Sequence, residues 1–327
     1  MTTGKNRKKV LIVGRMPEAG IDVLKKRDDV DYEVLTDDTV PSLHPKLKDA
    51  NAVTLGATPF RQAELDAAPG MMVVARLGVG FDAVEIPALN KRKIPLMTTG
   101  IANSVSVAEH AMYMMLASAR LVKKYDRFVR EKGWGQRLSD LPADLSGKSV
   151  LVVGMGRIGS RTVKRCFAFD MEVFVLDPNI SEAEIKKAGG TKVTDLKAIL
   201  PKMDFVSIHC PKAPETVNMF NAETLGLMKP EAFLVNTARG GIVNEDALYA
   251  ALSSGKLRGA GLDVLDKEPP DPANKLFGLE NVILSPHMAG VTKEASDRMA
   301  VTAVENILSV FDGRPNAANV VNKEVLG

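Results

Sequence analysis

Short apolar runs alternate with amphipathic stretches along most of the chain, which is the pattern of an α/β protein. In the first third, the runs that predict buried strands are residues 9–13, 32–35, 51–55, 71–76 and 94–97. The stretches that predict helices between them are residues 18–26, 59–67 and 82–91. This alternation predicts a small, doubly wound, mostly parallel sheet.

A second and larger sheet is predicted further along the chain. A helical segment rich in alanine and methionine extends from Ser104 to about Gly133. The six apolar runs that follow it are residues 149–153, 172–176, 204–209, 233–236, 259–264 and 282–285. Six parallel strands with intervening helices match a complete dinucleotide-binding (Rossmann) sheet. An amphipathic stretch at about 293–312 is left over, and we expect it to return to the first sheet.

The most informative motif directly follows the first strand of the second set. Gly154, Gly156 and Gly159 stand in G-x-G-x-x-G spacing, and Asp177 ends the next apolar run eighteen residues after the last glycine. The glycines permit a tight turn, close approach of a pyrophosphate and close packing of helix on strand. The helix N-terminus attracts phosphate, and a carboxylate can accept hydrogen bonds from a ribose diol. This order of elements predicts a dinucleotide site.

Composition limits the classes of function. The net charge of +3 is too small to predict nucleic-acid binding, and no apolar run reaches membrane-spanning length. The basic stretch at residues 5–9 has no apolar signal core, so we expect a solvated tail. Cys166 and Cys210 cannot build a disulfide framework and lie in no metal-ligand cluster. We therefore expect a cytoplasmic protein without a bound metal, a nucleic-acid partner or a membrane contact.

Polar residues suited to hydride transfer follow three strands of the second set. Arg239, Glu268 and His287 come after the fourth, fifth and sixth runs. Ligands bind beyond the carboxyl ends of parallel strands. There a histidine can move the proton of an alcohol, a carboxylate can orient the ring, and an arginine can hold a substrate carboxylate. In the first sheet, residues 76–82 (Arg-Leu-Gly-Val-Gly-Phe-Asp) occupy the corresponding place, where glycines can expose N–H groups to an anion.

Spacing alone leaves the identity of the base open. His209 also ends a strand, so its position does not separate it from His287. His44 lies in a polar stretch and His110 lies on the long helical segment, and both are expected to have structural roles. A structural ion pair is the alternative for Arg239.

Five motifs in this order resemble the D-isomer-specific 2-hydroxyacid dehydrogenase family over about residues 51–312. The motifs are residues 76–82, the glycine motif with its acid, residues 236–241 (Asn-Thr-Ala-Arg-Gly-Gly), residues 261–264 with Glu268-Pro269, and Ser285-Pro286-His287. The resemblance resolves the choice between the histidines. It implies that His287 is the general acid/base, that Glu268 is its partner and that Arg239 binds the substrate carboxylate and carbonyl.

The resemblance also implies that the cofactor is NAD. The contacts that it implies for NAD are those of Gly154, Gly156, Arg157, Ile158, Gly159, Asp177, Cys210, Pro211, Ala238, Asp263 and Gly290. Among these, Asp263 and the Ala238 carbonyl are expected near the nicotinamide carboxamide, and Pro211 near the adenine. Substrate contacts are implied for Arg76, for the N–H groups of Val79 and Gly80, and for Arg239.

The family further implies a discontinuous architecture. Residues 1–99 plus 298–327 would form a smaller, flavodoxin-like substrate domain, and residues 100–297 the Rossmann NAD domain. The helix after Ser104 is usually part of a dimer interface in the family. We therefore expect a homodimer.

The expected activity is reversible hydride transfer between NAD(H) and a small 2-oxo or 2-hydroxy acid. D-3-phosphoglycerate dehydrogenase is one alternative, because residues 239–243 and 268–270 resemble that branch. However, residues 55–58 (Leu-Gly-Ala-Thr) lack the arginine of the animal enzymes, for which Arg76 or Arg61 would have to compensate. Phosphite dehydrogenase is a second alternative, and an NAD-responsive, corepressor-like binding protein is a third.

Overall fold

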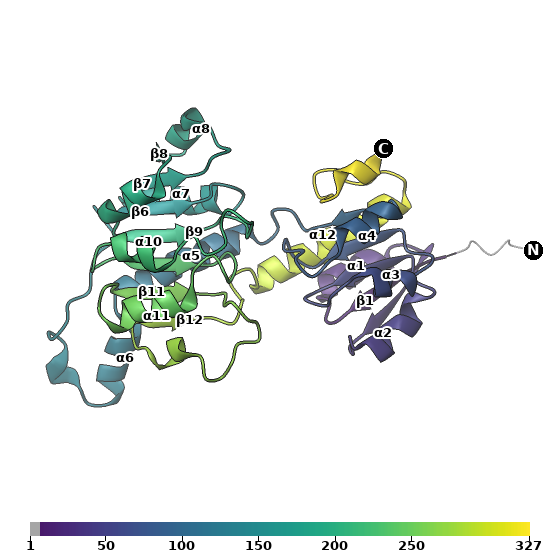
Figure 1. Ribbon diagram of the computed structural model, residues 1–327. Coiled ribbons are helices and arrows are strands. Elements are labelled where there is room, and N and C mark those ends of the chain that lie inside the picture. Colours follow the sequence, from purple (N-terminus) through teal and green to yellow (C-terminus); the bar gives the residue numbers. More distant parts are fainter. Residues whose placement is uncertain (1–6) are drawn as a thin grey trace, which may run out of the picture. The chain divides into compact units, whose positions relative to one another are not determined.

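Two separate parallel sheets organise the chain (Figure 1). The computed structural model describes residues 7–327. One unit combines the chain up to Asn103 with Val291–Gly327, and the other is Ser104–Gly290. The junctions therefore fall at 103 and 291 rather than at the expected 99 and 298. The first part of the basic stretch at 5–9 lies outside the described residues.

The first unit contains a five-stranded parallel sheet in the order β2-β1-β3-β4-β5. Its strands are β1 (Lys8–Val13), β2 (Val30–Leu35), β3 (Ala52–Leu55), β4 (Val73–Arg76) and β5 (Leu96–Met97). Its helices are α1 (Glu18–Lys25), α2 (Val40–Leu47), α3 (Gln62–Asp66), α4 (Ile86–Lys91) and α12 (Lys293–Phe311), and a short helical turn, η4 (Lys323–Leu326), ends the chain. This is the strand order of flavodoxin-like sheets, so the predicted fold class is confirmed.

Both faces of this sheet are covered, as the period of two along β1 shows. Val10 and Ile12 pack with α1 and α12, whereas Leu11 and Val13 pack with α2, α3 and α4. The contact of α1 with α12 is close, because a Cβ at Gly20 would lie 2.9 Å from the Cβ of Ala300. The last long helix thus completes the core of the first unit.

The second unit contains seven parallel strands in the order β12-β11-β10-β9-β6-β7-β8. The strands are β6 (Ser149–Val153), β7 (Glu172–Leu176), β8 (Thr191–Val193), β9 (Phe205–Ile208), β10 (Phe233–Asn236), β11 (Gly259–Leu262) and β12 (Val282–Leu284). The helices are α5 (Ser104–Ala119), α6 (Val122–Arg130), α7 (Gly159–Ala168), α8 (Glu182–Lys187), α9 (Leu196–Ile199), α10 (Ala222–Leu227) and α11 (Glu245–Ser253). The short helical turns are η1 (Trp134–Gln136), η2 (Leu200–Lys202) and η3 (Lys275–Gly278). The expectation of six strands was wrong by one, because the edge strand β8 was not predicted.

The long helical segment after Ser104 is two helices rather than one. Leu121 adopts a left-handed φ of 52° and separates α5 from α6. Met112, Met114 and Met115 of α5 are buried within their own unit, and a Cβ at Gly261 of β11 would lie 2.8 Å from the Cβ of Met114. The apolar face of α5 is therefore used to cover the sheet. No helix among residues 7–327 is long and apolar enough to span a membrane.

Candidate active site

The glycine motif forms an open cradle between β6 and α7. Gly154 has a φ of +88°, and a Cβ there would lie 2.7 Å from the Cys210 nitrogen, so the position favours glycine twice over. A Cβ at Gly159 would overlap the Gly154 carbonyl oxygen, which shows how closely α7 begins against the strand. At Gly156, by contrast, no described atom lies within 4 Å of the Cβ position. This leaves room for a diphosphate beside the backbone, as a dinucleotide requires.

Asp177 lies directly after β7 and is seated against the same cradle. Its Oδ2 accepts a hydrogen bond from the Met155 N–H at 2.7 Å, and its Oδ1 accepts one from the Asn179 N–H at 2.9 Å. Two backbone donors thus fix the carboxylate at the carboxyl end of the sheet. A ribose diol held over the glycine turn would meet an oriented acceptor there.

The other residues implied for the cofactor lie at the ends of the same strands or in the loops after them. Arg157 and Ile158 form the turn before α7, and the Arg157 carbonyl accepts a hydrogen bond from Arg161 at 2.6 Å. Pro211 follows β9, and its carbonyl accepts the Thr216 hydroxyl at 2.7 Å. Gly290 is the last residue of the second unit.

His209 and Cys210 follow β9 beside the cradle. Ser207 Oγ lies 2.8 Å from His209 Nε2, and within residues 7–327 no carboxylate is hydrogen-bonded to this ring. Burial lowers the pKa of His209 to about 4, so the ring is neutral at pH 7. Burial also raises the pKa of the Cys210 thiol to about 11. His209 therefore lacks the carboxylate partner that would stabilise a protonated ring in a general acid/base.

Arg239 lies in a loop fixed by the end of β10. Asn236 Nδ2 donates to the Arg239 carbonyl at 2.9 Å, and Asn236 Oδ1 accepts the Ala238 N–H at 3.0 Å. The guanidinium Nη1 donates to the Ala238 carbonyl at 2.7 Å. A Cβ at Gly240 would overlap the Leu265 carbonyl, so this loop packs directly on the segment that leads to Glu268.

Glu268 and His287 form a hydrogen-bonded pair. Glu268 Oε2 lies 2.7 Å from His287 Nδ1, and the Leu265 N–H donates to Glu268 Oε1 at 3.0 Å. Both side chains are partly exposed, His287 by 48% and Glu268 by 37%. Since Nδ1 is engaged with the carboxylate, Nε2 is the atom that can exchange a proton with a substrate.

Asp263 holds the turn that carries His287. It is 2% exposed, and its carboxylate accepts hydrogen bonds from the N–H groups of Met288 at 2.8 Å and Ala289 at 3.0 Å. Its backbone carbonyl accepts the His287 N–H at 2.8 Å. The Ser285 hydroxyl also donates to Asp263 Oδ1. Sequence reasoning did not find these links, because they join residues that are distant in the chain.

The loop predicted to bind the substrate anion belongs to the first unit. Arg76 ends β4, and its Nε donates to the Gly80 carbonyl at 2.9 Å, which closes the loop on itself. The Gly78 carbonyl accepts the Thr99 N–H at 3.0 Å. Arg61, the alternative cation, precedes α3 and donates its N–H to Glu64 at 2.8 Å.

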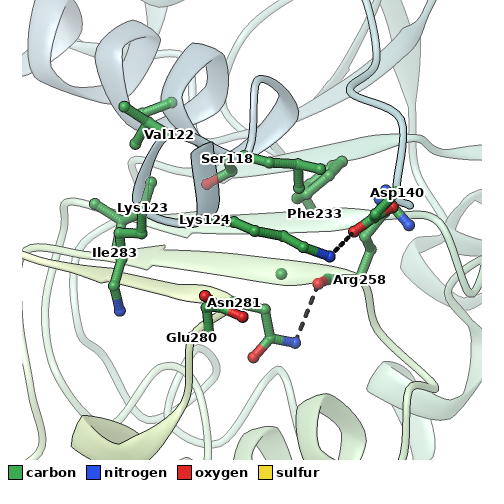
Figure 2. A pocket seen from close by; sticks show the side chains of 13 residues that line it. Ser118, Val122, Lys123, Lys124, Asp140, Phe233, Arg258, Glu280, Asn281 and Ile283 are labelled. Atoms are coloured by element: carbon green, nitrogen blue, oxygen red, sulfur yellow. Dashed lines mark hydrogen bonds and ion pairs between the residues drawn. The ribbon is translucent and has the colours of Figure 1, made fainter. Parts of the chain in front are cut away.

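A pocket of about 290 Å³ lies at the other end of the strands of the second unit (Figure 2). It is lined by the first residues of β10 and β11 and by residues at the start of β12. Asp140 bridges Lys124 at 2.9 Å and Arg258 at 2.6 Å on its wall, and these contacts tie the segment after α6 to the sheet. Because ligands of parallel sheets bind at the carboxyl ends, this pocket is distinct from the candidate site.

Comparison with known proteins points to one family. A family model described as the NAD-binding domain of D-isomer-specific 2-hydroxyacid dehydrogenases matches residues 112–289. A glyoxylate reductase of Thermofilum pendens is 38% identical over 328 residues, which cover 98% of this chain and 96% of the relative. A D-3-phosphoglycerate dehydrogenase of Archaeoglobus fulgidus is 35% identical over 97% of this chain, which spans only 60% of that relative's length.

A solved structure supports the same grouping. The D-lactate dehydrogenase of Aquifex aeolicus, complexed with NAD and lactic acid, is 28% identical and has a TM-score of 0.86. The similarity covers 97% of this chain and 99% of that one. NAD complexes therefore occur on this fold, and the open glycine cradle with its seated acid fits the same cofactor.

Proposed function

Because the chain belongs to the D-isomer-specific 2-hydroxyacid dehydrogenase family, we propose that it catalyses reversible, NAD-dependent reduction of a small 2-oxo acid to the D-2-hydroxy acid. The 2.7 Å contact between Glu268 and His287 carries this proposal. The pair follows β11 and β12, and Arg239 follows the adjacent β10. All three lie at the carboxyl edge of the sheet that also bears the glycine cradle.

Each of the three side chains has a distinct role in this proposal. The reduced nicotinamide, when bound, supplies a hydride. The Arg239 fork binds the substrate carboxylate and polarises the adjacent carbonyl. His287 donates the proton on Nε2 to the carbonyl oxygen in reduction and accepts it back in oxidation. Glu268 orients the ring through Nδ1 and stabilises its cationic form by charge.

The proposed reaction is balanced in atoms and in charge. In reduction, the carbonyl carbon gains the hydride, the carbonyl oxygen gains the proton from Nε2, and the oxidised cofactor and neutral imidazole remain. In the reverse direction, His287 must start unprotonated. We propose that the first unit is the substrate domain, in which Val79 and Gly80 supply backbone N–H groups to the substrate anion.

The substrate is proposed to lack a phosphate. Thr58, in the loop after β3 where a cation would be needed, donates its hydroxyl to Asp38 Oδ2 at 2.6 Å. The Asp38 carboxylate beside this loop would repel a phosphoryl group rather than bind it. The Arg76 side chain donates through Nε to the Gly80 carbonyl at 2.9 Å, so this cation contributes to its own loop.

The direct test is NADH oxidation with glyoxylate, hydroxypyruvate, pyruvate and longer 2-oxo acids. NAD reduction with 3-phosphoglycerate and with phosphite is measured in parallel. We expect turnover with at least one unphosphorylated 2-oxo acid. Turnover confined to 3-phosphoglycerate or to phosphite would favour the corresponding dehydrogenase, and cofactor binding without any turnover would favour a corepressor-like binding protein.

NAD is expected to be preferred over NADP. The carboxylate of Asp177 would repel a 2′-phosphate, and Pro178 and Asn179 after it offer no cation. The expected ratio of kcat/KM values is roughly 10–100-fold, the value of one charged hydrogen-bonding contact. Asp177→Ser should reduce that ratio, whereas Asp195→Ser, which removes a helix-capping carboxylate elsewhere in the unit, should leave it unchanged. Equal efficiency of the unchanged protein with both cofactors would refute the assignment.

We also propose that the protein is a homodimer. The apolar face of α5 is covered by its own sheet, so that face gives no reason to expect a dimer. Exposed apolar side chains instead gather after α5, where Trp134 is 64% and Leu138 is 72% exposed, together with Val129 and Leu141. Such a set on one short segment is typical of an interaction surface, and a second copy of the chain is the proposed occupant.

Sedimentation velocity at micromolar concentration checks this proposal. The unchanged protein should sediment with twice the mass of the 35.2 kDa chain. Trp134→Glu combined with Leu138→Glu should give the monomer, because two charges would be buried without partners. The matched control is Phe167→Glu, an exposed aromatic on α7. A monomeric unchanged protein would contradict the proposal.

A cytoplasmic location is the last part of the proposal. Cys166 and Cys210 are both free thiols. Burial raises the pKa of Cys166 to about 12 and that of Cys210 to about 11. Both therefore stay protonated near neutral pH, and free thiols are the usual state of cysteine in a reducing compartment.

A further inference from the structure

Three side chains from distant parts of the second unit form a hydrogen-bonded series that reaches the turn carrying His287. His110 lies on α5, Ser285 follows β12 and Asp263 follows β11. His110 Nε2 lies 2.9 Å from Ser285 Oγ, and Ser285 Oγ lies 2.5 Å from Asp263 Oδ1. The direct distance from His110 Nε2 to that carboxylate oxygen is 3.8 Å. The serine hydroxyl therefore links the histidine to the carboxylate.

The direction of the two hydrogen bonds follows from their chemistry. Asp263 acts as an acceptor toward its neighbours, so the Ser285 hydroxyl donates its single proton to Oδ1. The serine oxygen must then accept from His110, which places a proton on Nε2. Burial lowers the pKa of His110, although the charge of Asp263 opposes this effect. His110 is thus a neutral donor whose position is fixed by α5.

Asp263 also accepts hydrogen bonds from the residues around the proposed acid/base. It accepts the N–H groups of Met288 and Ala289 through its side chain, and that of His287 through its carbonyl. His287 has a φ of 55°, in the left-handed region that is unfavourable for a residue other than glycine. These hydrogen bonds offset that cost and hold the turn. A displaced Asp263 would therefore displace His287.

We propose that His110 and Ser285 are positioning residues, which hold the Asp263 carboxylate so that it fixes both the His287 turn and the place of the nicotinamide carboxamide. This inference rests on the proposed function for the role of Asp263 beside the nicotinamide. Neither His110 nor Ser285 needs to touch the substrate. Both act through Asp263.

Packing alone is the competing explanation for His110. Its ring lies 5.5 Å from the ring of Tyr113 on the same helix, and Tyr113 is largely exposed. His110→Phe keeps an aromatic ring but removes the donor, whereas His110→Gln keeps an N–H donor at a similar reach. Tyr113→Leu removes only the ring neighbour. Comparison of these variants separates hydrogen bonding from packing.

The test compares the affinities for NADH and ADP-ribose by calorimetry. ADP-ribose lacks the nicotinamide, so it reports on the glycine cradle but not on the surroundings of Asp263. For His110→Phe and for Ser285→Ala we expect the Kd for NADH to rise by about 10-fold, the loss of one hydrogen bond near a charge. The Kd for ADP-ribose should not change. His110→Gln should recover NADH binding, and Tyr113→Leu should behave like the unchanged protein.

The double variant of His110→Phe with Ser285→Ala gives the sharpest result. Because the two residues act through the same series of hydrogen bonds, the double variant should bind NADH no more weakly than the single variant with the lower affinity. Multiplication of the two effects would overturn the proposal, as would equal weakening of NADH and ADP-ribose, or no weakening of either. These affinities need no turnover. A protein that reduced no 2-oxo acid would contradict the proposed function, while the affinities would still decide the role of His110.

Discussion

Replacement of His287 by alanine is expected to lower kcat for 2-oxo acid reduction by about 10²–10⁴-fold, the usual contribution of a general acid/base. The structure gives the reason. Nδ1 of this ring is held by Glu268 at 2.7 Å, which leaves Nε2 for the proton of the substrate. The affinity for NADH should change little, because the glycine cradle is formed by other residues. Steady-state kinetics and NADH fluorescence titration measure the two quantities.

His209 is the matched control for this experiment. It also follows a strand at the same edge, but burial lowers its pKa to about 4 and its Nε2 lies 2.8 Å from the Ser207 hydroxyl oxygen. His209→Gln should therefore retain most of the turnover. If His287→Ala kept near-normal kcat while His209→Gln abolished it, the assignment of the acid/base would be wrong even within the same family.

Replacement of Arg239 by alanine is expected to reduce kcat/KM for the 2-oxo acid by about 10²–10³-fold, comparable to the loss of an oxyanion-stabilising donor. KM should rise because the substrate carboxylate loses its charged partner. The kcat value should fall because the carbonyl is no longer polarised. Arg239→Lys should recover only part of the loss, since an ammonium group cannot make the planar bidentate contact.

Arg258 provides the control for this prediction. It directly precedes strand β11 of the same sheet, and it pairs with Asp140 at 2.6 Å on the wall of the pocket in Figure 2. Arg258→Ala should leave KM for the 2-oxo acid unchanged. Full activity of Arg239→Lys would show that a single positive charge is sufficient and would contradict the proposed fork.

Strand β6 is the clearest case of a strand that the sequence alone predicted, because its residues are buried on both faces of the sheet. Val150 and Val152 of β6 pack on one side of the sheet, and Leu151 and Val153 pack on the other, so the run is continuously apolar. The edge strand β8 begins with the polar Thr191 and Lys192, and it gave no such signal.

The helices show a similar limit. Helix α2 was not predicted from the sequence because it contains two prolines, one in its first turn and one, Pro45, in its interior. Proline normally argues against a helix interior, yet Leu43 and Leu47 anchor the helix in the core. The break at Leu121 was also missed, since an apolar residue in the left-handed region has no local sequence signature.

The sequence predicted only part of the candidate site, because position along the chain does not reveal which side chains meet in the folded protein. Position after a strand brought Arg239, Glu268 and His287 to one edge, but it did not distinguish His287 from His209. The resemblance made that choice, and the contact of Glu268 with His287 supports it. The link from His110 through Ser285 depends on which side chains meet across α5 and β12. Such contacts depend on tertiary packing and leave no pattern in spacing.

The stereochemistry of the product tests the central claim most directly. The purified protein is incubated with NADH and each 2-oxo acid that supports turnover and has a chiral product, such as pyruvate or hydroxypyruvate. The 2-hydroxy acid is then analysed by chiral chromatography. We predict the D-isomer alone, formed in an amount equal to the NADH consumed. Formation of the L-isomer, or NADH consumption without a 2-hydroxy acid, would contradict the account.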